Sequence, residues 1–125
     1  MTDDPRLDRV SPLRYNVDMT QQERELVRKF KSLLSERLQA GFELFVFGSR
    51  ARGDADDESD LDVLVVTQEP ETYEVLMLVS GCAWEAALGS GMIINSVVFS
   101  RDAWENGPER DSDLARTVKE EGIPV

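Results

Sequence analysis

Two aspartates one residue apart, Asp60 and Asp62, stand at the start of an apolar run, and a Gly48-Ser49 pair precedes them by a polar loop. Residues i and i+2 of a strand point to the same face, so both carboxylates are predicted to project together. Adjacent carboxylates repel each other unless a cation lies between them, and Mg²⁺ prefers such hard oxygen ligands while also holding phosphates. The Gly-Ser turn can bring backbone N–H groups close to a triphosphate. The pattern therefore predicts a site for a metal ion and phosphates.

The composition restricts the chemistry of this site. The chain has 125 residues, no histidine and a single cysteine, Cys82. Zinc sites and Ser-His-Asp or Cys-His catalysis are thereby excluded, and the lone thiol fits a reducing cytoplasm. A net charge of −11 repels nucleic acid, and Arg50 and Arg52 are too few to form a nucleic-acid groove. No apolar run is long enough to cross a bilayer. We expect a cytoplasmic protein that binds neither nucleic acid nor membrane.

The elements around the motif are predicted from periodicity and capping signals. Residues 1–18 are predicted to be a mobile N-terminal arm, and residues 19–125 a single domain. A capping box at Thr20 and Glu23 begins a helix that Gly41 is expected to end. Pro70 is expected just inside the start of a second helix. Strands are predicted over 43–47, 61–66 and 92–99, the loop over 50–60, and further helices over 100–105 and 111–121. This order indicates an α/β (α+β) fold with a small mixed sheet packed by helices.

The second helix supplies several core candidates. Tyr73, Met77 and Trp84 recur at helical spacing, which favours core packing over base stacking. Cys82 lies in the same helix without an adjacent base, so we expect a buried structural thiol.

The motif resembles the signature of the polymerase-beta-like nucleotidyltransferase superfamily. Gly48-Ser49, ten intervening residues and then Asp60-Leu61-Asp62-Val63 carry the resemblance, and the wider pattern is similar to that of the minimal nucleotidyltransferases. The resemblance covers residues 42–99 and, more weakly, 119–125. It implies the fold of that superfamily and transfer of a nucleoside monophosphate, such as AMP, from ATP or another NTP to a hydroxyl acceptor.

The resemblance also implies roles for single residues. Gly48 and Ser49 would hold the β- and γ-phosphates, and Asp60 and Asp62 would bind two Mg²⁺ ions that bridge them. Arg50 or Arg52 would neutralise phosphate charge. The alternative for these two arginines is surface ion pairs with the acidic residues at positions 54 and 56–58.

The predicted third strand departs from the family pattern. Members of the superfamily place a third carboxylate on this strand, but it contains no Asp or Glu, and Asn95 and Ser96 stand in that region. An asparagine can coordinate a metal but cannot act as a carboxylate base. Either another acid substitutes, with Glu43, Asp54 and Asp56 as candidates by sequence position, or catalysis is weak.

Two functions from different classes follow. The first is a Mg²⁺-dependent nucleotidyltransferase, for which the resemblance implies a protein acceptor on a HEPN-type helical toxin, with a small-molecule acceptor as the variant. The second is a degenerate nucleotide-binding module that neutralises a partner protein by contact.

Overall fold

The computed structural model describes residues 19–53, 55–56 and 58–125, so the predicted arm at residues 1–18 lies outside the described residues. Four strands form one mixed sheet in the order β3-β2-β1-β4. They are β1 (Phe42–Phe47), β2 (Leu61–Thr67), β3 (Ile94–Ser100) and β4 (Ile123–Pro124). Strand β1 is antiparallel to β2 and β4, and β2 is parallel to β3. The expected small mixed sheet packed by helices is confirmed.

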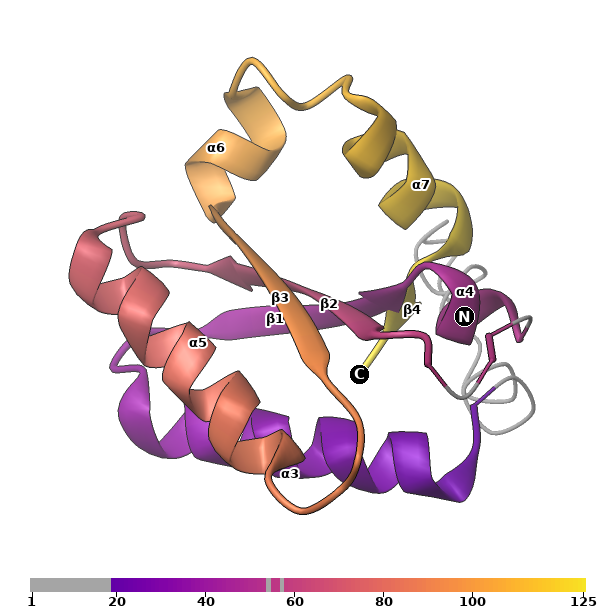
Figure 1. Ribbon diagram of the computed structural model, residues 1–125. Helices are drawn as coiled ribbons and strands as arrows, with labels where there is room; N and C mark the ends of the chain where they lie inside the picture. Colours follow the sequence, from indigo (N-terminus) through magenta and orange to yellow (C-terminus); the bar gives the residue numbers. More distant parts are fainter. Residues whose placement is uncertain (1–18, 54, 57) are drawn as a thin grey trace, which may run out of the picture.

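Helices cover both faces of this sheet (Figure 1). Helices α3 (Gln21–Arg37) and α5 (Tyr73–Ala87) pack on one face, while α6 (Arg101–Asn106) and α7 (Asp113–Glu121) lie on the other. The single turn α4 (Ser49–Arg52) follows β1 directly. Within the described part of the chain, no helix is long and apolar enough to cross a membrane.

The alternation of side chains along β2 produces two cores. Leu61, Val63 and Val65 pack toward α3 and α5, in a cluster that includes Val27, Phe30, Leu34, Val75 and Val79. Leu64 and Val66 point to the other face and pack with Phe47 and Val118. Because β2 is buried on both faces, its apolar run is nearly continuous after Asp62.

Two predicted helix boundaries are wrong. The capping box at Thr20 begins α3 as predicted, but the helix ends at Arg37 because Leu38 turns to an extended conformation and buries its side chain. Gly41 therefore is not the residue after the helix. Helix α5 begins after Thr72, whose hydroxyl accepts a hydrogen bond from the N–H of Val75, so Pro70 lies before the helix.

The predicted core role of Tyr73, Met77 and Trp84 is also wrong. Their exposed fractions are 72%, 53% and 68%, whereas Cys82 is buried as predicted. Helix α5 is apolar on most of its circumference, so periodicity alone did not identify the face that packs. Its small and β-branched residues face the core: Val75, Val79, Cys82, Ala83 and Ala86.

Candidate active site

The start of β2 places Asp62 between two neighbouring strands. Asp62 pairs in register with Phe47 of β1 on one side and Asn95 of β3 on the other. Its half-buried side chain alternates with Leu61 and Val63, so it lies on the face that carries α6 and α7. Asp60 is exposed and precedes the first residue of β2. The two aspartates thus lie where β2, an inner strand of the sheet, begins.

Gly48 approaches the Asp62 carboxylate closely enough to require glycine. Its backbone angles, φ 80° and ψ −160°, lie in a region that only glycine adopts readily. A Cβ at this position would lie 2.3 Å from Oδ2 of Asp62, so a side chain would displace the carboxylate. The carboxylate therefore leans over the Gly48-Ser49 turn. Because Gly48 has no side chain, the turn can lie close to Oδ2 of Asp62, and carboxylate oxygens are typical metal ligands.

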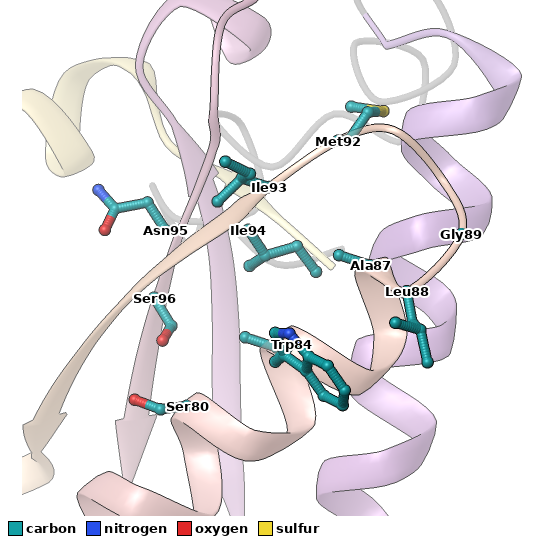
Figure 2. A pocket seen from close by; sticks show the side chains of 11 residues that line it. Ser80, Trp84, Ala87, Leu88, Gly89, Met92, Ile93, Ile94, Asn95 and Ser96 are labelled. Carbon is teal, nitrogen blue, oxygen red and sulfur yellow. The ribbon is translucent and has the colours of Figure 1, made fainter.

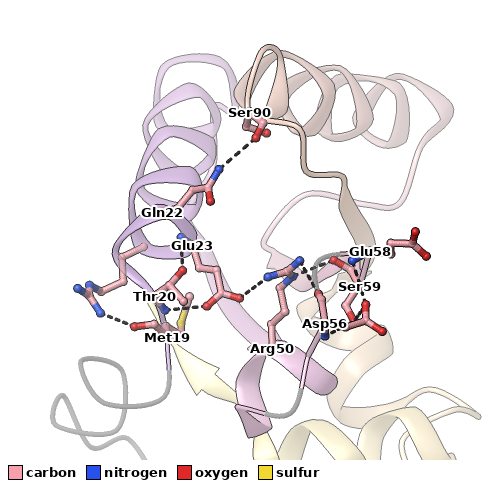
Figure 3. A network of polar contacts seen from close by, with 10 residues as sticks. Met19, Thr20, Gln22, Glu23, Arg50, Asp56, Glu58, Ser59 and Ser90 are labelled. Atoms are coloured by element: carbon pink, nitrogen blue, oxygen red, sulfur yellow. Dashed lines mark hydrogen bonds and ion pairs between the residues drawn. The ribbon is translucent and has the colours of Figure 1, made fainter.

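Arg50 has a buried set of partners. Its Nη1 forms an ion pair with Oε2 of Glu23 at 2.8 Å, and its Nε donates to the carbonyl of Ser59 at 2.8 Å. Its Nη2 donates to the carbonyl of Asp56 at 3.3 Å. Figure 3 shows these contacts converging on one guanidinium between α3 and the motif loop. Arg50 therefore pairs with Glu23 of α3 and not with the described carboxylates of its own loop. Its predicted contact with phosphate stays a prediction.

Glu23 is the site-supporting residue that sequence reasoning missed. One carboxylate oxygen closes the capping box by accepting from the N–H of Thr20 at 2.7 Å, and the other accepts from Arg50. The capping box identified the first role. The signal for the ion pair with Arg50 was the position of Glu23 on the apolar side of α3. A charged residue there is buried, at 3% exposed, and needs a partner.

Arg52 lies on the exposed side of the turn. Its Nη1 pairs with Oε2 of Glu121 at 3.1 Å, and both side chains are partly accessible. The pairing links the motif turn to the end of α7.

Asn95 occupies the position where a third carboxylate was sought. It lies opposite Asp62 on β3, and its Nδ2 donates to Oδ1 of Asp62 at 2.9 Å. Ser96 alternates to the other face, so Asn95 alone contacts the aspartate side. The amide holds the Asp62 carboxylate in place and adds no negative charge.

Two of the three substitute acids proposed from sequence position, Glu43 and Asp56, have their partners elsewhere. Glu43 pairs in the β1–β2 register with Val66, which lies four residues along β2 from Asp62. Its carboxylate forms an ion pair with Arg101. The carboxylate of Asp56 accepts from the N–H of Glu58 at 2.9 Å and from Oγ of Ser59, within its own loop. Asp54 lies outside the described residues. Across residues 19–53, 55–56 and 58–125, no group of three or more acidic or Cys side chains could hold a metal.

Comparison with known proteins gives the family. Residues 27–123 match the family described as the nucleotidyltransferase domain. The Methanocaldococcus jannaschii protein named "Putative protein adenylyltransferase MJ0141" is 31% identical over 78 residues, 62% of this chain and 79% of that protein. The one named "Putative protein adenylyltransferase MJ0604", from the same organism, is 31% identical over 99 residues, 79% of this chain and 89% of that protein.

A crystal structure described as a "putative nucleotidyltransferase" from Sulfolobus solfataricus covers 86% of this chain and 89% of its own, with a TM-score of 0.43 and 19% identity. That likeness is too slight to support an argument. The matched family instead spans β1, the motif turn, the paired aspartates, β3 and the C-terminal helices, and both relatives match over most of their length. The chain belongs to the nucleotidyltransferase domain family, as the motif predicted, and is a nucleotidyltransferase.

Proposed function

We propose that this protein transfers AMP from ATP to a hydroxyl group of a partner protein, in a reaction that depends on Mg²⁺. The observation that carries the proposal is the contact geometry of Gly48 and Asp62, in which the absent Cβ leaves the carboxylate oxygen lying over the turn. Both relatives are named as protein adenylyltransferases, which supports ATP as donor and a protein as acceptor.

The residues present suit a divalent cation. Asp62, on the second residue of β2, and Asp60, just before that strand, offer carboxylate oxygens, the donor type that Mg²⁺ prefers. When bound, Mg²⁺ would offset the charge of the phosphates and of the oxygens that attack and leave. Gly48 and Ser49 would hold the phosphates through backbone N–H groups at the start of α4, which the helical turn itself does not use. Arg52 is the arginine exposed enough to approach them, and Arg50 would fix the loop.

In the proposed reaction, the acceptor oxygen bonds to the α-phosphorus of ATP. The bond from that phosphorus to the bridging oxygen breaks, and pyrophosphate leaves. The proton of the acceptor hydroxyl passes to solvent or to an exposed carboxylate, for which Asp60 is the candidate in this chain. The family resemblance supports a helical HEPN-type toxin as the acceptor, which this protein would silence as the antitoxin.

The second candidate is a module that binds nucleotide and blocks its partner by contact without transfer. Asn95 favours it, because the residue facing Asp62 from β3 donates a hydrogen bond and cannot accept the acceptor's proton as a carboxylate would.

Labelled ATP separates the two candidates. The protein is incubated with a co-expressed HEPN-type partner, Mg²⁺ and ATP carrying label at the α- or the γ-phosphate. We expect label on the partner from α-labelled ATP only, and loss of labelling with Asp62→Asn. Asp111→Asn removes the same charge from an exposed position in the turn before α7 and serves as the control. Unlabelled partner that is still neutralised, by both wild type and Asp62→Asn, would identify the binding module.

A further inference from the structure

Helix α5 and its C-cap residue Leu88 carry an apolar stripe on the face opposite their core residues. Tyr73, Met77, Trp84 and Leu88 follow one another at spacings of four, seven and four residues, which places them along one helix face. Between 53% and 72% of each side chain is exposed. Figure 2 shows Trp84 and Leu88 in this region, with Ile93 on the segment that follows. Large apolar side chains that are exposed together on one helix face mark a candidate interface.

The charges around the stripe limit what can cover it. Between Tyr73 and Ile93 the only charged residues are Glu74 and Glu85, and Glu85 already pairs with Arg37 at 2.7 Å. Nucleic acids and anionic membranes require Lys or Arg, which this segment lacks. A strongly basic partner would find few acids here, although the chain as a whole carries a net charge of −11. The occupant must therefore itself present an uncharged apolar surface.

The order of large and small residues along the stripe is symmetric. The midpoint lies between Ser80 and Gly81, with Met77 and Trp84 at equal distances from it, and Tyr73 and Leu88 at equal, larger distances. A second α5 that runs antiparallel would set Met77 of one copy against Trp84 of the other. The stripe is therefore complementary to itself about a two-fold axis, as an isologous interface requires.

Gly81 at this midpoint has no packing role within its own chain. A Cβ built on it would have no atom within 4 Å, apart from neighbours in its own helix. Glycine in the interior of a helix costs about 0.5–1 kcal/mol relative to alanine. Close approach of a second helix is a physical reason for a small residue here.

We propose that two copies of this chain associate through antiparallel α5 helices with a two-fold axis at Ser80 and Gly81. The proposal does not depend on the acceptor or on transfer activity. The stripe is about 24 Å long and about 10 Å wide. The area that these dimensions enclose is smaller than the roughly 800 Å² that each partner contributes to a standard interface. We therefore expect a weak, reversible dimer. Because each copy carries a charge of −11, association strengthens as salt increases.

Cysteine cross-linking tests the register of the two helices. Ser80→Cys lies beside the axis, so mild oxidation should join two copies of this variant through a disulfide. Tyr73→Cys and Leu88→Cys should each fail to join with themselves, but a mixture of the two should give the mixed dimer. The wild-type protein, whose own Cys82 is buried, shows how much cross-linking occurs without an introduced cysteine. Self-joining of Leu88→Cys, or no joining of Ser80→Cys, would overturn the arrangement.

Sedimentation equilibrium tests the association itself. The wild-type mass should rise toward that of a dimer between about 5 and 500 µM, and Trp84→Glu should remain monomeric over this range. Ser35→Glu adds the same charge on the exposed side of α3 and should dimerise as wild type does. Circular dichroism of each variant verifies that it is folded. A wild type that is monomeric throughout, or a dimer that Trp84→Glu leaves intact, contradicts the proposal.

Discussion

At the scale of single residues, Gly48 determines where the Asp62 carboxylate lies. Gly48→Ala should lower the free energy of unfolding by about 1–3 kcal/mol through backbone strain, and more through the contact at 2.3 Å. It should also weaken Mg²⁺ binding, because the displaced carboxylate no longer faces the turn. Urea denaturation and calorimetric titration with MgCl₂ in the presence of ATP measure the two effects.

Gly89 provides a matched control for this substitution. Its φ is also 80°, but a Cβ there would have no atom within 4 Å. Gly89→Ala should therefore lower stability through strain alone and leave Mg²⁺ binding unchanged. Equal Mg²⁺ affinities for the two variants would contradict the role given to Gly48.

Asn95 gives a second prediction at this scale. Asn95→Asp places a carboxylate opposite Asp62 in the strand register and removes the donated hydrogen bond. A further acidic ligand should tighten Mg²⁺ binding, and a carboxylate base should raise AMP transfer about tenfold or more. Initial rates with α-labelled ATP at saturating Mg²⁺ test this. A slower variant would mean that the amide itself serves the reaction.

At the scale of elements, Arg50 joins the motif loop to α3. The side chains of Arg50 and Glu23 are 10% and 4% exposed, so removing one leaves the other buried and unpaired. Arg50→Met should therefore lower the free energy of unfolding by about 3–5 kcal/mol. It should also reduce transfer at temperatures where the variant is still folded, since the carbonyls of Asp56 and Ser59 lose their common donor.

The double variant Arg50→Met/Glu23→Leu isolates the pair. Its loss of stability should be smaller than the sum of the two single losses, because neither charge remains buried alone. Additive losses in chemical denaturation would show that the two residues act independently.

The Cys82 thiol in the packed face of α5 predicts a dependence of stability on pH. Burial raises the pKa of Cys82 above its ordinary value of 9.0, and the nearby Arg37 opposes the rise. A raised pKa in the folded state means that the contribution is present below pH 9.0 and is lost as the pH rises through the folded-state pKa. The stability advantage of wild type over Cys82→Ala should therefore shrink above about pH 9. Thermal unfolding of both proteins between neutral and alkaline pH measures this difference, and a constant difference would contradict it.

Local sequence signals predicted where the helices and strands lie, but not which residues of different elements contact each other. Thr20 and Glu23 marked the start of α3, and a nearly continuous apolar run marked β2, because capping and burial act over a few residues. The partner of Arg50 lies 27 residues away on another helix, and only packing determines that approach. The exposed face of α5 was missed for the same reason. Tyr73 and Trp84 have the composition of a core, but the sheet is already covered by smaller side chains of that helix.

At the scale of the whole molecule, the candidate active site and the proposed dimer surface lie on different sides of the sheet. Asp62 points toward the face that carries α6 and α7, whereas the apolar stripe belongs to α5 on the other face (Figure 1). A dimer formed through α5 therefore leaves both turns at Gly48 open to nucleotide and acceptor.

The net charge of −11 gives the last prediction, which concerns the folded domain as a unit. Like charges held on one small surface repel each other more strongly than in the extended chain, so screening by salt should stabilise the fold. We expect the unfolding temperature to rise by about 5 °C between low salt and 0.5 M NaCl. The measurement is made at about 2 µM protein, below the expected range of self-association, so that dimer formation does not add to the effect.

Glu109→Lys shows whether charge repulsion is the cause. Glu109 is exposed in the turn between α6 and α7, and this change lowers the net negative charge by two. The variant should unfold at a higher temperature than wild type in low salt and should gain less from added NaCl, since it has less repulsion to screen. Glu109→Gln should lie between the two. Identical salt responses for all three proteins would mean that salt acts through apolar burial and not through charge.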